Sequence, residues 1–258
     1  MDTASWANFP HDNKPFTYAG SRLAAAWPDL HRGDTEPLPD NEALLGAWRH
    51  FHAGNFAAAV EQAETLGAAG HAVANKASGI YADYLEEDEA IKIEIYRQGI
   101  ERAEAAIAEF PDDANAHYFR AFLLGRYSQS ISVAKALAQG IGGRVRQSLE
   151  TALQLAPEHA EAHTAMGLYH AEIIDKVGKM VGRMTYGASA DRAMEHFERA
   201  LELTPEAPIA HIEYGNGLYL LFGDKRLDES NAAYERAAAI EPIDAMQKLD
   251  MEYARNSL

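Results

Sequence analysis

The feature that most constrains this chain is a sequence pattern that recurs along it and closes each time with a proline. Three copies are clear, and a fourth, IERAEAAIAEFPDDANAH at 100–117, is weaker. Each copy has the spacing of an Ala-rich amphipathic helix. Because proline cannot continue a helix but is tolerated where the next one begins, each copy predicts a helical hairpin. The clear copies are RQSLETALQLAPEHAEAH (146–163), MEHFERALELTPEAPIAH (194–211) and NAAYERAAAIEPIDA (231–245).

The second helix of each hairpin follows a more detailed pattern: a small residue, then an aromatic residue, then Ala-Leu, then proline. One copy matches throughout, and in the others Tyr234 is the aromatic residue or Leu149 replaces it. In the first helix, Gly167 and Gly215 occupy a small-residue position where the two helices approach closely. This pattern resembles the tetratricopeptide repeat (TPR) over roughly residues 41–245. The full match comprises Ala193, Phe197, Ala200, Leu201 and Pro205.

The resemblance implies an all-α fold, a right-handed superhelix of stacked helix pairs with a concave face. We expect about five helix pairs in 41–245, including a proline-less copy at 44–67. Residues 1–40 are rich in Pro, Gly, Asp and Asn. They predict an N-terminal arm, packed on the first hairpin, with a short helix at Ser21–His31 anchored by Trp27. Residues 246–258 predict a C-terminal cap helix.

Two repeats are longer than the family pattern. The distances between successive prolines are 46, 48 and 37 residues, against 34 in TPR proteins. In both long repeats the excess falls between the two helices, at 127–143 and 173–189. Apolar residues at helical spacing predict that the first helix is elongated there, with Gly140, Gly142 and Gly143 at one helix end. We expect the two elongated helices to cover each other's apolar side.

Ten residues form a candidate binding site, seven from the register of the resemblance and three from the charge of the elongation. The family register puts first-helix side chains on the concave face, including Asn115 and Glu161, and the elongations add local positive charge. Arginine can hold a carboxylate through two hydrogen bonds, so an anionic group or an acidic peptide end suits this edge. The ten are Tyr118, Phe122, Arg126, Thr164, Leu168, Asn216 and Tyr219 in the groove, with Lys176, Lys179 and Arg183 on the elongation.

The sequence indicates no catalytic or metal chemistry. There is no cysteine, no complete phosphate-binding loop and no G-x-S-x-G turn, so we expect no enzyme activity, no cofactor and no metal. His117, His163 and His211 recur at equivalent positions, which predicts a packing role between hairpins. His159 and His163 are four residues apart, but no third metal ligand accompanies them.

Charge and hydropathy restrict the partners. The formal net charge is -16, so nucleic acid is excluded as a main partner. No apolar run is long enough to span a membrane, and we expect no membrane insertion. The N-terminal residues lack a signal-peptide pattern. We therefore expect a cytoplasmic protein, or an exported one if the numbering starts after a removed signal.

These observations favour a non-catalytic binding scaffold for a peptide, a protein or a small ligand. A weaker resemblance, carried by GLYHAEIIDKVG and TYGASADRAMEHFERALEL, is to T-component proteins of TRAP transporters. That resemblance implies a solute-binding accessory protein with a small organic anion as ligand. A third hypothesis is an oligomeric structural protein that associates with itself through the projecting helices.

Overall fold

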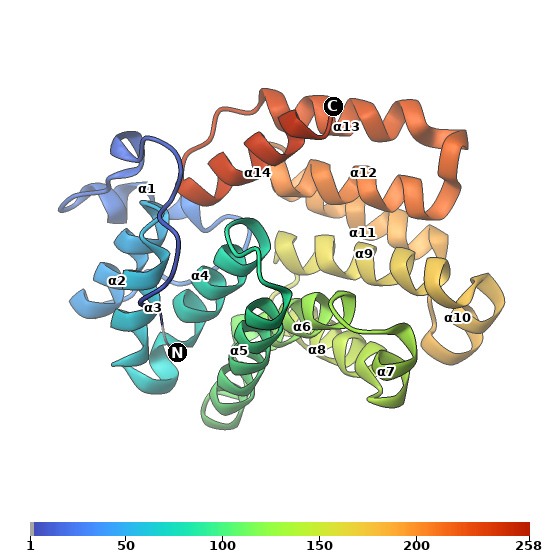
Figure 1. Ribbon diagram of the computed structural model, residues 1–258, viewed down its shortest axis with the longest axis horizontal. Coiled ribbons are helices and arrows are strands. Elements are labelled where there is room, and N and C mark those ends of the chain that lie inside the picture. Colours follow the sequence, from blue (N-terminus) through green and yellow to red (C-terminus); the bar gives the residue numbers. More distant parts are fainter. Residues whose placement is uncertain (1–2) are drawn as a thin grey trace.

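The computed structural model describes residues 3–258, and in that range it contains helices and no strand. Five antiparallel pairs form the array (Figure 1). The prediction of an all-α array of stacked hairpins is confirmed. The pairs are α2 (Glu42–His52) with α3 (Phe56–Glu64), α4 (His71–Tyr84) with α5 (Glu89–Glu109), α6 (Ala114–Gln129) with α8 (Ile141–Leu155), α9 (Ala160–Val177) with α11 (Ala190–Leu203), and α12 (Pro208–Phe222) with α13 (Leu227–Ala239).

The turns between hairpins are built alike, and the repeated histidines belong to them. Pro111, Pro157 and Pro205 each lie three residues before the first residue of the next helix. A histidine in that helix donates from Nε2 to the proline carbonyl, at 2.8, 3.0 and 2.8 Å for His117, His163 and His211. Each recurring histidine therefore closes the turn that joins its own hairpin to the preceding one, through a hydrogen bond that the sequence pattern did not predict.

The close approach of helices within a hairpin rests on the glycine and aromatic positions of the pattern. A Cβ atom on Gly167 would lie 2.8 Å from the ring of Phe197, and one on Gly215 would lie 3.0 Å from Tyr234. Phe197 is fully buried. From the next repeat Gly217 meets the same ring, because a Cβ atom there would overlap Cε2 of Phe197. Phe197 is thus held between glycines of α9 and α12.

The elongated first helices are absent, and this prediction was wrong. Helix α9 ends at Val177 because Gly178 has a φ of 81°, and a separate short helix, α10 (Lys179–Tyr186), follows. In the preceding repeat α6 ends at Gln129, and α7 (Val133–Ala138) is likewise separate. Gly140 has a φ of 62° and begins α8, so Gly142 and Gly143 lie in the first turn of that helix.

The two short helices also do not cover each other's apolar residues. No residue of α7 is buried, and only Gly182 is buried in α10. Met180 is 74% exposed and Met184 is 82% exposed. The expectation that the projecting segments would shield each other is therefore wrong.

The N-terminal arm and the last helix join the two ends of the array. The arm contains a short 3-10 helix, η1 (Lys14–Phe16), and α1 (Arg22–Leu30), and Trp27 of α1 is buried against Trp48 of α2. The final helix, α14 (Ala245–Asn256), contacts α13, α12 and also α2 (Figure 1). At this junction His52 contacts Asp244 at 2.9 Å, and the Tyr18 hydroxyl donates to the Ile243 carbonyl.

Two further 3-10 helices lie in turns, η2 (Gly67–Gly70) before α4 and η3 (Gly223–Arg226) before α13. The largest apolar core runs from Phe16 in the arm to Leu249 in α14, and two smaller clusters lie in the last hairpins. None of the helices in residues 3–258 has the length and apolar run that crossing a bilayer requires.

We predict that Gly217→Ala destabilises the protein by about 1–3 kcal/mol, since the new methyl group overpacks the fixed ring of Phe197. The matched control is Gly125→Ala in α6, where an added Cβ meets nothing within 4 Å. That control is expected to be neutral or stabilising by up to about 1 kcal/mol, because alanine favours a helix interior. Urea unfolding measures both, and equal stabilities would contradict this account of the packing.

Candidate functional site

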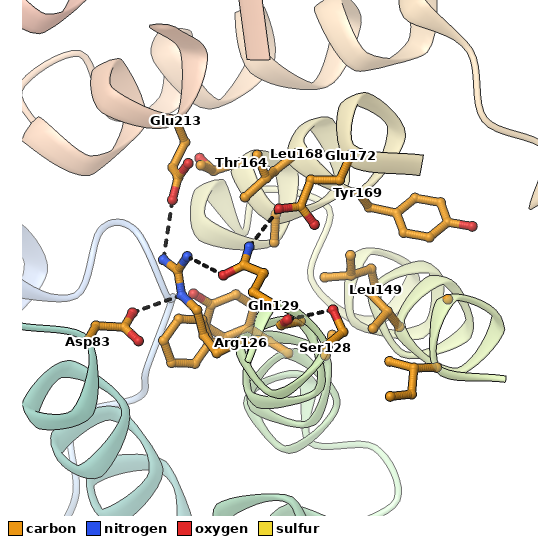
Figure 2. Close-up of a pocket in the computed structure, with 18 of the residues that line it drawn as sticks. Asp83, Arg126, Ser128, Gln129, Leu149, Thr164, Leu168, Tyr169, Glu172 and Glu213 are labelled. Atoms are coloured by element: carbon orange, nitrogen blue, oxygen red, sulfur yellow. Dashed lines mark hydrogen bonds and ion pairs between the residues drawn. The ribbon is translucent and has the colours of Figure 1, made fainter. Parts of the chain in front are cut away.

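A cavity with a volume of about 190 Å³ lies on the inner side of the array. Its walls come from α4, α6, α7, α8, α9, α10, α12 and α14 (Figure 2). One side is apolar and the other carries charged and amide groups. The apolar side includes Phe122, Val133, Leu137, Ile141, Leu149, Leu168 and Ile173, and the polar side includes Asp83, Arg126, Gln129, Glu172, Lys176 and Glu213.

Six of the ten residues predicted from the sequence line this cavity: Tyr118, Phe122, Arg126, Thr164, Leu168 and Lys176. The other four do not. Lys179 and Arg183 lie on the exposed side of α10, and Tyr219 is 55% exposed on α12. Asn216 accepts from the Tyr234 hydroxyl and donates to Glu213, so its amide is used within the last hairpin.

The predicted site did not include Asp83, Glu213 or the residues of α7. Asp83 lies in the last turn of α4. This helix is the first helix of its hairpin, and its sequence was not aligned with the other copies of the repeat. The register that places Tyr118 and Phe122 in the groove does not point to Asp83, so no local pattern indicates it. Val133 and Leu137 were placed on an elongated helix, and their position beside the cavity follows from the break after Gln129.

Arg126 is neutralised within the structure. Its Nε atom forms an ion pair with Asp83 at 2.8 Å, without the alignment of a hydrogen bond, and its Nη2 atom donates to Glu213 at 3.3 Å (Figure 2). Burial alone lowers the pKa of Arg126, but the two carboxylates raise it above its ordinary value. A guanidinium held by two carboxylates has little capacity left for an anionic ligand.

Beside Arg126 the cavity carries another acidic side chain, Glu172, and a lysine at its edge, Lys176. Gln129 donates from Nε2 to Glu172 at 2.6 Å, and burial raises the pKa of Glu172. Lys176 is about half exposed and lies 3.5 Å from Asp175. The cavity therefore offers paired or hydrogen-bonded charges beside an apolar wall, and no unpaired buried cation among the residues that line it.

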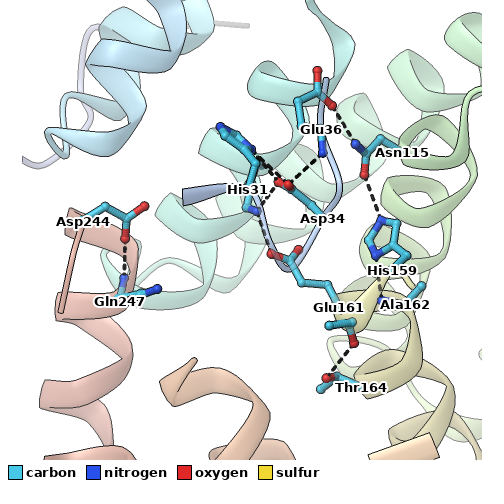
Figure 3. Close-up of polar contacts among 12 residues, drawn as sticks. His31, Asp34, Glu36, Asn115, His159, Glu161, Ala162, Thr164, Asp244 and Gln247 are labelled. Atoms are coloured by element: carbon cyan, nitrogen blue, oxygen red, sulfur yellow. Dashed lines mark hydrogen bonds and ion pairs between the residues drawn. The ribbon is translucent and has the colours of Figure 1, made fainter. Parts of the chain in front are cut away.

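The N-terminal arm occupies the neighbouring part of the concave face (Figure 3). The backbone N–H of Glu161 donates to the Gly33 carbonyl at 3.0 Å. Asn115 donates to Glu36 at 2.6 Å and receives a hydrogen bond from His159 at 2.9 Å. Asn115 and Glu161 are first-helix positions predicted to face the groove. The arm thus fills one section of that groove with residues of the same chain.

A buried ion-pair cluster fixes the arm there. Lys76 donates to Asp34 at 2.6 Å and to Glu161 at 2.7 Å, and His31 contacts Asp34 at 3.0 Å. Burial alone raises the pKa of Asp34, but the charge of Lys76 and the hydrogen bond from His31 hold it well below the usual range. Burial lowers the pKa of His31 and of His159 to about 4, so both imidazoles are neutral at pH 7.

Two histidines meet outside the cavity, where His163 Nδ1 and His196 Nδ1 lie 2.9 Å apart. Their pKa values are lowered mainly by burial, as is that of neighbouring His170. Within residues 3–258, however, no group of three or more histidine or carboxylate side chains is placed to hold a metal ion.

We predict that Asp34→Asn lowers the free energy of unfolding by about 3–5 kcal/mol, because it leaves Lys76 buried with one partner fewer. The control, Asp29→Asn, removes a carboxylate that pairs with Arg32 at the surface. An exposed ion pair contributes about 0–1 kcal/mol to the free energy of unfolding. Chemical unfolding at pH 7 compares the two, and a similar small loss for both variants would show that the buried pair does not fix the arm.

A second prediction concerns Asp250 of α14, whose pKa burial raises to about 8. The folded chain keeps its proton at pH 5–7, whereas the unfolded chain releases it. The stabilising effect of the proton on Asp250 is therefore lost as pH rises toward 8. Asp250→Asn should make the fall in stability with pH shallower by about 1.4 kcal/mol per pH unit. Unfolding at several pH values tests this against the exposed control Asp40→Asn; identical slopes for Asp250→Asn and wild type would refute it.

Comparison with known proteins agrees with this architecture. The chain is similar to the crystal structure of TTC0263, a thermophilic TPR protein from Thermus thermophilus, with a TM-score of 0.59 and 18% identity. The match covers 83% of this chain and 98% of that one, and at this identity it concerns the fold alone. It confirms the TPR-like fold predicted from the repeats. No curated protein matches the chain.

A match to a family model gives evidence of common ancestry, which a shared fold at low identity does not. Residues 60–248 match the model described as regulator of microtubule dynamics protein 1-3. The matched range comprises all or most of four of the five hairpins and extends into α14. Because this range is well over half of the chain, the protein belongs to the family of regulator of microtubule dynamics proteins 1-3.

Proposed function

We propose that this chain is a non-catalytic TPR-like scaffold that binds a segment of a partner protein and takes an apolar side chain of that segment into the cavity. The observation that carries the proposal is the cavity itself, an apolar wall on the inner face of the array. Buried apolar anchors in fitted pockets dominate the affinity of protein interfaces. The name of the family refers to microtubule dynamics, which also supports a protein partner.

The size of the cavity favours an anchoring side chain of a partner protein over a whole small molecule. Pockets for small ligands typically measure about 300–1,000 Å³, and this one measures about 190 Å³. A space of this size suits one or two side chains whose backbone stays outside. A longer ligand would then gain the rest of its affinity from the surface around the opening.

The charges of the cavity do not favour the organic anion of the transporter hypothesis. Arg126 is held by Asp83 and Glu213, and Glu172 also faces the cavity. A carboxylate ligand would enter beside Glu172 and would have to displace a partner of Arg126. Lys176, at the edge, is the one predicted cation placed to meet an acidic group of a partner segment.

Gly125 allows a sharp test, because it lines the cavity and a Cβ atom there would meet nothing within 4 Å. Gly125→Leu should fill the cavity and weaken partner capture at least tenfold without lowering the melting temperature. The matched control is Gly143→Leu on α8. An added Cβ atom there also meets nothing within 4 Å, but the residue does not line the cavity.

Quantitative pull-down from lysate of the source cells, compared across wild type and the two variants, measures the effect. Proteins captured by wild type and by Gly143→Leu, but not by Gly125→Leu, are the expected partners. If Gly125→Leu captures the same proteins in the same amounts, the cavity does not anchor a partner. A thermal-shift series with small organic acids tests the transporter hypothesis separately, since a bound ligand raises the melting temperature.

A further inference from the structure

The two short helices α7 and α10 carry an exposed surface that extends beyond the cavity. We name it the rim patch. Its apolar members are Val133 and Leu137 of α7, with Met180, Val181 and Met184 of α10, and each is at least 43% exposed. Its cations are Lys135, Lys179 and Arg183. Both helices border the cavity and lie at the end of the long axis away from α1 and α2 (Figure 1).

The conformation of α10 directs its apolar side chains outward. Gly178 and Gly187, both with positive φ, bound the helix at its two ends. Gly182 is buried, and a Cβ there would lie 3.3 Å from Ile173 of α9, so this side of α10 rests on the array. At 3.6 residues per turn, Met180 and Met184 lie on roughly the opposite side. Lys179 and Arg183 flank them along the helix.

The cations of the rim patch are free. No described carboxylate forms an ion pair with Lys135, Lys179 or Arg183, whereas most other Lys and Arg side chains in residues 3–258 have such a partner. Neither α7 nor α10 contains an acidic residue. The acids nearest along the chain are Glu172 and Asp175, bonded to Gln129 and Lys176, and Asp191 at the start of α11.

We propose that the rim patch docks the protein on the surface of an anionic membrane, as a peripheral contact in which the methionines reach the lipid headgroup boundary. Free cations next to exposed aliphatic side chains are the composition of helices that lie in a membrane interface. Protein interfaces are depleted in lysine and enriched in aromatic residues, methionine and arginine. The methionines and the arginine of the patch therefore fit either partner, whereas its two lysines and the absence of an aromatic residue among its exposed residues favour the membrane.

The net charge of -16 does not oppose this docking. At physiological salt the Debye length is about 8 Å, so charges farther from the bilayer than this are largely screened. The potential of an anionic leaflet also falls off within that distance. The local charge of α7 and α10 therefore decides the contact, and the acidic remainder of the chain sets the orientation by staying away from the lipid.

Cosedimentation of the full chain with vesicles tests the proposal. The expected result is binding to phosphatidylcholine vesicles that contain about 30% phosphatidylserine, weak binding to phosphatidylcholine alone, and loss of binding as salt is raised, because salt screens the attraction. Lys179→Gln with Arg183→Gln should weaken partitioning roughly 25-fold, about fivefold for each cation near the surface. The charge-matched control is Lys14→Gln with Arg22→Gln, in the N-terminal arm.

The apolar part is tested in the same assay. Met180→Gln with Met184→Gln should weaken partitioning at least tenfold, whereas Leu38→Gln with Ile91→Gln, at exposed positions outside the patch, should not. No binding to either vesicle, or equal binding by wild type and both rim-patch variants, would overturn the proposal. A wild-type chain that ignores vesicles but forms dimers lost in these variants, measured by light scattering, would assign the patch to self-association instead.

The docking proposal and the cavity proposal fail independently. Gly125→Leu fills the cavity and leaves the cations and methionines of α10 unchanged, so it should keep vesicle binding while losing the partner protein. The rim-patch variants leave the cavity open. A rim-patch variant that loses the captured protein while wild type ignores vesicles would refute membrane docking and make the patch part of the protein interface.

Discussion

The ammonium group of Lys76 connects three segments that the sequence keeps far apart. It lies between Asp34 of the arm and Glu161 of α9, and it belongs to α4. Moving such charges out of water is costly, so the cluster persists only because each charge has partners at hydrogen-bond distance. With hydrophobic packing alone the arm could slide along the groove. The ion pairs give it one position, and the two residues that hold it there, Lys76 and Glu161, also line the cavity.

The position of the arm also explains why the cavity is small and largely apolar. TPR-like arrays present a continuous concave face, but here the arm occupies the section at Asn115 and Glu161. The two short insertion helices border the other section, where Phe122 and Leu168 remain available. Charges at the boundary between the sections are paired within the chain, as Arg126 shows. The result is a small apolar recess in place of an open charged groove.

The sequence predicted what depends on local pattern. The prolines, glycines and aromatic residues of the repeat specify helix ends and the close contact between neighbours, so the hairpins and five of the six predicted lining residues follow from them. The sixth, Lys176, was predicted from the positive charge of the insertion. Long-range polar contacts carry no such pattern, and nothing near Asp34 in the sequence indicates Lys76 or Glu161. The insertions were misassigned because an apolar stripe continues through Gly178, while a single φ of 81° ends the helix. Helical periodicity cannot detect that break.

The contact between the two ends of the array changes how the protein can unfold. In an open repeat array each repeat touches only its neighbours, and the terminal repeats can fray while the middle stays folded. Here His52 of the first hairpin contacts Asp244 at the start of α14, and Tyr84 of the second hairpin donates to Asp250 within it. Neither end can fray without exposing the buried groups of the other. The array therefore resembles a globular domain in its cooperativity, and repeats cannot be added or removed from it as they can in an open solenoid.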